Sequence, residues 1–371
     1  MKTLHVITGL GIGGAEQQLR LLLRHLPARS DVVALTNPGP VAGQLRDDGV
    51  QVTHLGMRGN RDLRAVPKLA RIIARGNYDL VHTHLYRACV YGRSAARLAG
   101  VPAIATEHSL GRHHIEGRPL SRGNRALYLL TERLGHGTVA VSETVAMRLR
   151  KWGVPDRRIH VVPNGIDAAQ FRYCEDRRRQ TRARLAIAPD TFVVGAVGRL
   201  VPGKRFELLL RAMAETPGAH LLLVGDGPER QSLERLALEL GITDRVHLPG
   251  ACGLDGRVLN IPGLLAAMDV FVSTSREEAF GLAVVEALAA GLPVLHTACP
   301  ALEDLPAEHT TGAVRVSSHP TLLARELTRY GRAGTRRIPP PAAVGHYDIS
   351  HSADRLMHIY DAILRRTSSR S

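Results

Sequence analysis

Short runs of β-branched and aliphatic residues alternate along the chain with longer segments in which apolar residues recur every three or four positions. The short runs predict buried strands, and the periodic segments predict amphipathic helices. Strands are expected at Leu4–Thr8, Val32–Leu35, Val50–Leu55, Leu80–His84, Ala103–Thr106, Thr138–Val141, Ile159–Val162, Phe192–Val197, Leu221–Val224, Val246–Leu248, Val270–Val272 and Pro293–His296. Helices are expected at Ala15–His25, Val66–Arg75, Ala88–Ala99 and Ser350–Arg366. This alternation predicts an α/β protein with parallel sheets.

The expected strands form two series, and 371 residues are enough for two domains. The basic polar stretch Arg172–Arg184 separates the series, so we expect the linker near it. One Rossmann-like domain should cover residues 1–170, completed by a closing helix at 350–371. A second should cover residues 171–349. We expect the two parallel sheets to face a central cleft, because ligands bind at the carboxyl ends of such sheets.

Charge and cysteine content narrow the possible environments and partners. Residues 1–170 carry 24 Lys and Arg against 12 Asp and Glu, whereas residues 171–371 carry 25 against 22. The basic first half therefore indicates an anionic partner, namely lipid, a phosphorylated acceptor or nucleic acid. Nucleic acid is disfavoured, since aromatics make up only 4% of the chain and no basic region carries interleaved stacking residues.

No run of about twenty apolar residues is present, and the first residues lead directly into a strand with no signal-peptide core. The four scattered cysteines fit free thiols, not disulfides or a zinc site. We therefore expect a cytoplasmic protein. Segment Arg125–Arg133 is amphipathic and cationic; it suits an anionic bilayer surface, although an ordinary helix with its apolar face in the core is favoured.

The most informative segment is Ser275–Gly291, in which Glu278 and Glu286 lie eight positions apart. If both belong to one helix, they are separated by about two turns and lie on roughly one face. Backbone amides near Phe280, Gly281 and Leu282 would form the helix N-terminus, which attracts phosphate. Two carboxylates beside an anion site suit a nucleotide-sugar, whereas a lone pair of glutamates would more often be one cap and one solvated side chain.

Glycines follow the first strand in the segment Gly9-Leu-Gly-Ile-Gly-Gly-Ala-Glu16. Its spacing satisfies the dinucleotide fingerprint, so a NAD-dependent oxidoreductase is a serious alternative. That class needs an acidic residue at the end of the second strand, where this chain has Thr36 and Asn37. A phosphate or sugar contact through the backbone, or simply a tight turn, explains the glycines equally well.

Further candidates lie at other strand ends. Arg199 and Lys204 follow a strand, and both cations could hold a diphosphate with no metal, although loop cations are usually just solvated. His82 and His84 share one strand face, and His113 and His114 are adjacent, but no third ligand is evident and metal binding is not expected. His108 follows a buried strand, which makes it a candidate sugar or acceptor contact, or a structural histidine.

Taken in order, these motifs resemble one family. They are Gly13-Gly14-Ala15-Glu16, His108, Val162-Pro-Asn-Gly-Ile-Asp167, Gly198-Arg199 with Lys204, Gly225-Asp-Gly-Pro228 and Glu278-x7-Glu286. Their order and spacing are similar to those of the family 4 retaining glycosyltransferases of the GT-B fold. Departures are Arg205 where Gly is common, a longer segment at 250–263, and Cys299-Pro-Ala-Leu-Glu303 in place of a Gly-Gly-x-x-Glu loop. They affect the identity of the sugar or nucleotide more than the reaction class.

The resemblance implies specific roles. Arg199 and Lys204 would hold the donor diphosphate, and Glu286 the ribose of the nucleotide. Glu278, with the backbone of Phe280, Gly281 and Leu282, would hold the donor sugar and its phosphates. His108 would contact the sugar near the reaction centre, and Gly13 and Gly14 would approach donor and acceptor. The family needs no metal or other cofactor and retains the anomeric configuration.

The expected function is sugar transfer from a nucleotide-sugar, with a UDP-sugar as the expected donor, to a lipid-linked or surface-glycan acceptor. An anionic membrane surface would be a further partner of the basic N-terminal domain, placing the protein at the inner face of the membrane in polysaccharide biosynthesis. Alternatives are a GT-B-like UDP-sugar epimerase, a glycosyltransferase of a soluble natural product, and a NAD-dependent oxidoreductase. A non-catalytic sugar-nucleotide-binding protein is a weaker option.

Overall fold

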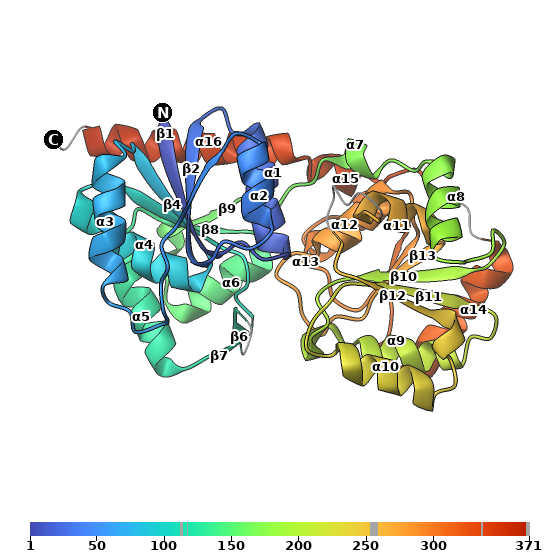
Figure 1. Cartoon of the computed structure of the whole chain (residues 1–371). Helices are drawn as coiled ribbons and strands as arrows, with labels where there is room; N and C mark the ends of the chain where they lie inside the picture. Colours follow the sequence, from blue (N-terminus) through green and yellow to red (C-terminus); the bar gives the residue numbers. More distant parts are fainter. Residues whose placement is uncertain (112–113, 117, 253–258, 335–336, 369–371) are drawn as a thin grey trace. The chain divides into compact units, whose positions relative to one another are not determined.

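The computed structural model describes the chain apart from residues 112–113, 117, 253–258, 335–336 and 369–371, together with the side chains of 118 and 368. The chain divides into two compact units (Figure 1). The first unit is Met1–Gly165 with Ile349–Ser371, and the second unit is Ile166–Asp348. Each unit contains one large parallel sheet, which confirms the predicted α/β class with two Rossmann-like sheets.

The first unit contains a seven-stranded sheet in the order β3-β2-β1-β4-β5-β8-β9. All of its neighbouring strands run parallel. The strands are β1 (Lys2–Gly9), β2 (Arg29–Asn37), β3 (Gln51–His54), β4 (Leu80–His84), β5 (Ala103–Glu107), β8 (Thr138–Ala140) and β9 (Ile159–Val161). The order reverses direction between β1 and β4, so the loops after these two strands diverge and leave room for a ligand.

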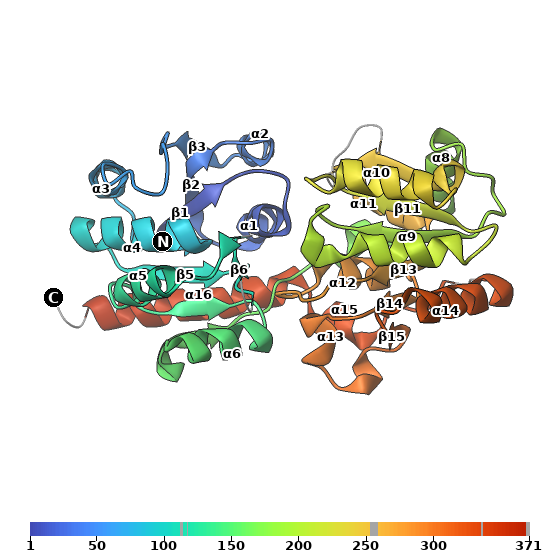
Figure 2. The same ribbon diagram turned by 90° about the horizontal axis from the view of Figure 1, so that it is seen from below.

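Helices cover both faces of this sheet (Figure 2). α1 (Gly14–His25) and α16 (Ile349–Ser368) share a core with one face, and α3 (Ala65–Arg75) and α4 (Tyr86–Ala99) share a core with the other. The remaining elements are α2 (Val41–Asp47), α5 (Arg122–Glu132), α6 (Glu143–Trp152), a 3-10 turn at Asp156–Arg158, and the hairpin β6 (His114–Ile115) and β7 (Arg118–Pro119). The closing helix therefore belongs to the first unit, where Ser352 also donates to the Pro163 carbonyl at 2.8 Å.

The second unit contains a six-stranded parallel sheet in the order β12-β11-β10-β13-β14-β15. Its strands are β10 (Val193–Val197), β11 (His220–Val224), β12 (Val246–Gly250), β13 (Val270–Ser273), β14 (Val294–His296) and β15 (Ala313–Arg315), the last of which the sequence pattern missed. α9 (Phe206–Ala214), α10 (Arg230–Glu239) and α14 (Pro320–Ala333) contribute to the core on one face. The other helices are α7 (Ala168–Phe171), α8 (Glu175–Arg184), α11 (Ile261–Ala267), α12 (Leu282–Ala289), α13 (Pro300–Glu303) and α15 (Ala342–His346), and 3-10 turns lie at Pro202–Lys204, Thr243–Arg245 and Ala307–His309.

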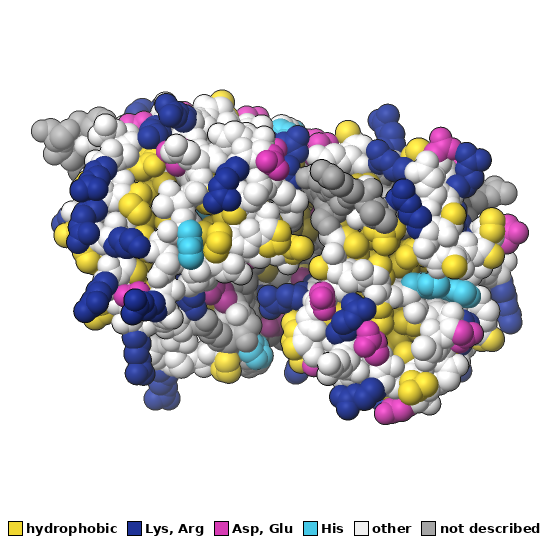
Figure 3. Space-filling model, in the orientation of Figure 1, with side chains coloured by type: hydrophobic (Ala, Val, Ile, Leu, Met, Phe, Trp, Pro, Cys, Tyr) yellow, Lys and Arg dark blue, Asp and Glu magenta, His cyan; other side chains and the backbone are white. Residues whose placement is uncertain are grey.

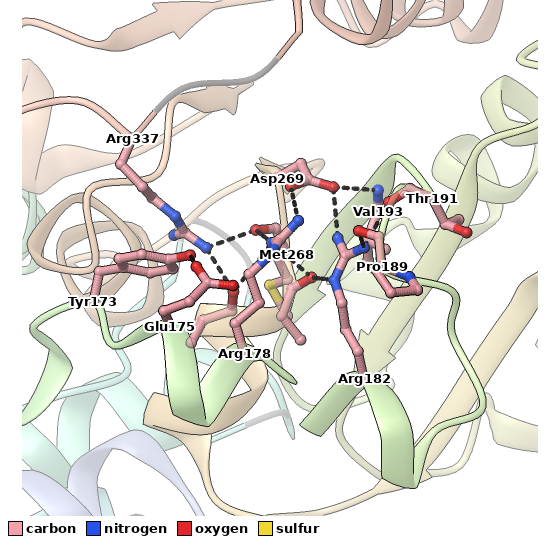
Figure 4. A network of polar contacts seen from close by, with 12 residues as sticks. Tyr173, Glu175, Arg178, Arg182, Pro189, Thr191, Val193, Met268, Asp269 and Arg337 are labelled. Carbon is pink, nitrogen blue, oxygen red and sulfur yellow. Dashed lines mark hydrogen bonds and ion pairs between the residues drawn. The ribbon is translucent and has the colours of Figure 1, made fainter. Parts of the chain in front are cut away.

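The basic stretch Arg172–Arg184, near which the linker was expected, belongs to the second unit. Residues Glu175–Arg184 form helix α8, and two of its arginines bind the carboxylate of Asp269 at the start of β13 (Figure 4). Arg182 also donates to the carbonyls of Ala188, Pro189, Thr191 and Ala267. A basic polar stretch is typical of a solvated linker. The sequence alone does not show that these arginines are paired inside the unit. The boundary expected at residue 170 likewise falls within α7 of the second unit.

Within the described residues, no helix is long and apolar enough to cross a bilayer.

Candidate functional site

In the second unit, the predicted cations lie on the loop that follows β10. Gly198 and Arg199 leave the strand, a 3-10 turn at Pro202–Lys204 follows, and α9 begins at Phe206. Arg199 is exposed on this loop. The neighbouring glycines, Gly225 and Gly227, allow the loop to approach β11 closely, because a Cβ on Gly225 would lie 1.9 Å from the Gly198 carbonyl oxygen. The Gly225-Asp-Gly-Pro228 motif is therefore a packing requirement of the loop that carries Arg199.

Lys204 and Glu278 form an ion pair. The Nζ of Lys204 lies 2.5 Å from Oε1 of Glu278, and the Ser275 hydroxyl donates to the same oxygen at 2.6 Å. The backbones of the two loops are also joined, since the Arg276 amide donates to the Gly203 carbonyl at 2.9 Å. Two residues 74 positions apart in sequence are thus held together, with the lysine as a charged donor and the glutamate as an acceptor.

The N-terminus of α12 has the backbone geometry expected for the segment, but Glu278 does not belong to the helix. α12 begins at Leu282, and its N-cap Gly281 has φ 109°, a left-handed conformation that glycine adopts without a steric penalty. A Cβ there would also lie 2.5 Å from the Cys299 sulfur. The inference that Glu278 and Glu286 share one helix face is therefore wrong, because the chain turns at Gly281 and Glu278 lies on the preceding loop.

Phe280 and Leu282, on either side of Gly281, lie in different environments. The Phe280 ring is buried and packs edge-on against Tyr347 at 4.9 Å between centroids, while its carbonyl accepts from the Ala301 amide. Its ring and carbonyl are therefore used within the unit, and a ligand could use only its amide. Leu282 is the first residue of α12, where backbone N–H groups have no partner within the helix.

Glu286 lies in the middle of α12 and is partly buried. Burial raises the pKa of its carboxyl group from an ordinary 4.5 to about 7. The apolar helix around it, which includes buried Val284, Val285 and Leu288, disfavours the charged form. Glutamates with a purely structural role are seldom buried without a partner. A buried carboxyl group with a raised pKa, such as that of Glu286, is therefore a candidate ligand contact.

Arg205 accounts for one departure from the family pattern. It adopts φ 52° at the N-cap of α9, which explains why glycine is common at this position. Its guanidinium donates to the Thr274 carbonyl at 2.9 Å and to the Thr297 hydroxyl at 3.3 Å. The side chain therefore connects the loops after β10, β13 and β14, and these contacts offset the cost of the left-handed backbone.

In the first unit, the glycine loop leads from β1 into α1. Gly13 is the N-cap in an extended conformation and Gly14 is the exposed first residue of the helix. A Cβ on Gly13 would lie 2.5 Å from a carboxylate oxygen of Glu16. At the end of β2, Thr36 donates to the Thr8 carbonyl and Asn37 accepts from the Gly39 amide. These contacts place no carboxylate where a dinucleotide ribose would require one.

His108 follows β5, on a cavity that is also lined by His84 and Thr106. Its Nε2 lies 3.1 Å from Nδ1 of His84, while its own Nδ1 is buried and has no hydrogen-bond partner among the described residues. Burial lowers the pKa of His108 to about 4, so the ring is neutral at physiological pH. A neutral imidazole can contact sugar hydroxyls as donor or acceptor.

His82 and His84 belong to a larger cluster than the sequence indicated. His5 on β1 joins them, and one nitrogen from each ring lies within 4.8 Å of the others. Each of the six ring nitrogens has a hydrogen-bond partner: His5 contacts Thr3 and His84, His82 contacts Tyr360 and Thr106, and His84 contacts His5 and His108. The lone pairs that would bind a metal are already engaged. His113 lies outside the described residues, and His114 belongs to β6.

The sequence assigned no role to two polar residues that lie next to predicted site residues, Ser275 in the second unit and Glu107 in the first. Ser275 belongs to the acidic segment but had no role assigned, although it shares an oxygen of Glu278 with Lys204. Glu107, the last residue of β5, is fully buried, and burial raises the pKa of its carboxyl to about 8. Its position directly before His108, at a strand end, is the signal that could have identified it.

Comparison with known proteins connects this geometry to a family. Residues 12–170 match the model of Glycosyltransferase Family 4, and residues 177–333 match that of Glycosyl transferases group 1. A D-inositol 3-phosphate glycosyltransferase of Nocardia farcinica is 31% identical over 78% of this chain and 67% of its own length. The chain belongs to the family 4 glycosyltransferases.

Other family 4 relatives and solved structures agree. The D-inositol 3-phosphate glycosyltransferase of Salinispora tropica is 33% identical over 69% of this chain, although the match spans only 57% of that protein. An Escherichia coli UDP-Gal:alpha-D-GlcNAc-diphosphoundecaprenol alpha-1,3-galactosyltransferase is 28% identical over 63% of this chain and 62% of its own. Anabaena HepE, crystallised with UDP and glucose, has a TM-score of 0.85 at 24% identity, covering 98% and 100% of the two chains. These likenesses confirm the GT-B fold and the transferase class of the family.

Proposed function

We propose that this family 4 glycosyltransferase moves a sugar from a UDP-sugar to a lipid-linked or surface-glycan acceptor and retains the anomeric configuration. The observation that carries the proposal is the Lys204–Glu278 pair at the carboxyl end of the second sheet. Similar proteins supply the chemical class: HepE was crystallised with UDP-glucose, and the Escherichia coli relative is named for UDP-Gal and a diphosphoundecaprenol acceptor.

The ion pair is a preorganised donor site in which each partner keeps the other in position. When a nucleotide-sugar enters, its diphosphate replaces Glu278 as the partner of Lys204, and Arg199 adds a second cation. Glu278 then accepts hydrogen bonds from sugar hydroxyls, with the amides of Phe280, Gly281 and Leu282 directed at the sugar and phosphates. Glu286 accepts from the ribose, and His108, Gly13 and Gly14 contact the sugar and acceptor from the first unit.

The reaction then needs no side-chain base. The acceptor oxygen forms a bond to the anomeric carbon on the face from which the diphosphate departs, and the bond from that carbon to the phosphate oxygen breaks. The acceptor proton passes to the departing phosphate oxygen, so the products are the glycosylated acceptor and UDP. Lys204 and Arg199 stabilise the charge that develops on the leaving group, which is commonly the largest electrostatic contribution.

The proposed lipid-linked acceptor is supported by the positive charge of the first unit and by apolar side chains exposed on its surface. The first unit carries much of the excess of Lys and Arg, and these side chains are spread over its visible face (Figure 3). On α5, Leu127 and Leu130 are 44% and 63% exposed, and Arg122 at the start of the helix and Arg133 at its C-cap are exposed as well. We propose that this surface contacts anionic lipid at the cytoplasmic face of a membrane.

A second acceptor class has its own support. Relatives at 31% and 33% identity are named for D-inositol 3-phosphate, a soluble phosphorylated polyol, and a basic first unit also suits that acceptor. Incubation of the protein with UDP-glucose and either inositol phosphate or a polyprenyl-diphosphate sugar distinguishes the two. Transfer to the lipid supports the first proposal, and transfer to the polyol supports the second.

Donor binding is tested by thermal shift with UDP-sugars, GDP-sugars and NAD, with and without EDTA. A rise in Tm with a UDP-sugar that persists in EDTA is the expected result. A rise with NAD alone would overturn the donor assignment. An epimerase would convert the UDP-sugar with no acceptor present, and a binding protein would bind it without any transfer.

A further inference from the structure

A row of buried polar side chains crosses the sheet of the first unit and ends at His108. Thr3 and His5 lie on β1, and His84 lies on β4. The Thr3 hydroxyl is 2.8 Å from the Ser30 hydroxyl and 3.3 Å from Nε2 of His5. Nδ1 of His5 is 3.0 Å from Nε2 of His84, and Nδ1 of His84 is 3.1 Å from Nε2 of His108.

The row lies on one face of the sheet, inside a core that is otherwise apolar. Thr3, His5 and His84 are each at most 1% exposed, and the surrounding cluster includes Ile7, Leu80 and Ile104. Burying polar groups costs free energy unless each of them is hydrogen-bonded. Three such residues in a row, between a partly exposed serine and a site residue, therefore require an explanation beyond packing.

Each member of the row can donate only one hydrogen. A hydroxyl has one hydrogen, and a neutral imidazole has one N–H and one lone pair. Burial lowers the pKa of His5 to about 3 and that of His84 well below its ordinary value, so both rings are neutral. The direction of one hydrogen bond in the row consequently fixes the direction of the next.

The backbone fixes the first direction. The Ser30 hydroxyl donates to the Ala28 carbonyl at 3.3 Å, and a hydrogen used in this bond is not available to Thr3, whose hydroxyl lies 2.8 Å away. Thr3 must then donate to Ser30, and His5 must donate from Nε2 to Thr3. His84 donates from Nε2 to His5, and His108 donates from Nε2 to His84. This order leaves a lone pair on Nδ1 of His108, the buried nitrogen with no partner among the described residues.

We propose that Ser30, Thr3, His5 and His84 form a polarised hydrogen-bond relay that keeps Nδ1 of His108 unprotonated, as an acceptor for a hydroxyl of the donor sugar. The relay residues are positioning residues, since they act through His108 and touch no substrate. Assigning that hydroxyl to the donor sugar rests on the proposed function. The tautomer of His108 itself does not.

The tautomers are read directly from long-range ¹H–¹⁵N spectra of the full chain labelled with ¹⁵N-histidine, at pH 8 and without ligand. Single substitutions of His5, His84 and His108 assign the resonances. We expect all three rings to carry the proton on Nε2. Protonated Nδ1 on His108 in the wild-type protein would overturn the proposal.

Two remote substitutions test the coupling. Ser30→Ala removes the acceptor of Thr3, so Thr3 can donate to His5, and the proton on all three rings should move partly or fully to Nδ1. Thr3→Val removes the anchor while keeping the shape of the side chain, so a mixture of tautomers is expected. Neither residue is near His108 in the row, so unchanged His108 resonances in both variants would refute the relay.

Thr83→Val is the matched control. Thr83 is a fully buried threonine on β4 between His82 and His84, and it faces the opposite side of the sheet, where its methyl group packs against Gly92. This variant should leave all three tautomers unchanged; a change equal to that in Thr3→Val would mean that the tautomers report general loosening of the sheet. Zinc bound at His5, His82 and His84, detected by elemental analysis, would also overturn the relay.

Activity provides the second readout. Ser30→Ala should lower kcat by about tenfold, the factor for one lost hydrogen bond of about 1.4 kcal/mol, with UDP affinity unchanged. If His108→Ala keeps full activity, the proposed sugar contact fails while the spectra still decide the relay. If the tautomers follow the prediction and kcat does not fall, His108 is polarised but its Nδ1 is not the sugar contact.

Discussion

If Glu286 holds the ribose of the nucleotide, as proposed, nucleotide-sugar binding should depend on pH in a direction that can be calculated. Its carboxyl pKa is about 7 in the free protein because the group is buried. To accept two ribose hydroxyls it must be ionised, so binding should return its pKa towards the ordinary 4.5 and release a proton. Affinity should therefore rise with pH between 6 and 8.

The size of the change in affinity follows from the fraction of Glu286 carboxyl groups that are ionised before the ligand binds. With a pKa of about 7, roughly one molecule in eleven is ionised at pH 6 and about nine in ten at pH 8. The dissociation constant should thus be about tenfold higher at pH 6 than at pH 8, a difference of about 1.4 kcal/mol. At pH 7, about half a proton should be released for each ligand bound.

Isothermal titration calorimetry with UDP-glucose measures both quantities, because its diphosphate does not titrate in this range and buffers with different ionisation enthalpies count the protons. Glu286→Gln is the control: it keeps the shape of the side chain and should bind weakly with no such dependence on pH. Equal wild-type affinities at pH 6 and pH 8 would refute the reasoning. Tighter binding at pH 6 would mean that the protonated acid donates to the ligand.

The same pKa shift predicts a change in stability with the opposite trend. Because the folded-state pKa is raised above the unfolded value, Glu286 stabilises the native state fully below about pH 4.5, and this contribution is lost as pH rises through about 7. Relative to Glu286→Gln, the wild-type protein should lose up to about 3 kcal/mol over that interval. Urea unfolding at pH 5 and pH 8 measures the difference, and parallel curves for the two proteins would contradict it.

Other substitutions test other parts of the site and fold. Lys204→Ala should lower kcat by about 10²–10³-fold, as for a lost preorganised donor, whereas Lys151→Ala, at an exposed lysine of the first unit, should keep the wild-type rate in the same transfer assay. Asp269→Asn should cost about 3–5 kcal/mol in urea unfolding because it leaves Arg178 and Arg182 without their carboxylate, while Glu326→Gln, at an exposed pair, should cost less than about 1 kcal/mol. Gly225→Ala should lower Tm and weaken UDP-sugar binding by displacing Gly198, whereas Gly218→Ala, where a Cβ meets nothing within 4 Å, should lower Tm less and leave binding unchanged.

The sequence predicted the strands of both units well because parallel strands buried on both faces are nearly continuous apolar runs. Leu80–His84 was predicted with the observed bounds, and the other predicted strands differ at their ends by a few residues. β15, by contrast, was missed: its three residues include an exposed Val314 and Arg315, so it lacks that signal.

The candidate site was predictable only in part. Local motifs identified Lys204 and Glu278, but their ion pair is a contact between residues 74 positions apart, which one sequence does not reveal. Helix periodicity failed for Glu278 because Gly281 reverses the backbone before α12 begins. His5 was missed for a similar reason, since only the pairing of β1 with β4 brings it to His82 and His84.

The first unit is made of two separate segments of the chain, and this has a consequence for the order in which the two units are completed during synthesis. The second unit is one continuous stretch, so all of it is synthesised while the first unit still lacks α16. Until then one face of the β1–β9 sheet has no cover from α16, and His82 has no Tyr360 to contact. The unit whose synthesis begins first is thus the unit completed last, and a released chain that ends at residue 348 should keep the compact second unit while exposing an apolar face of the first sheet.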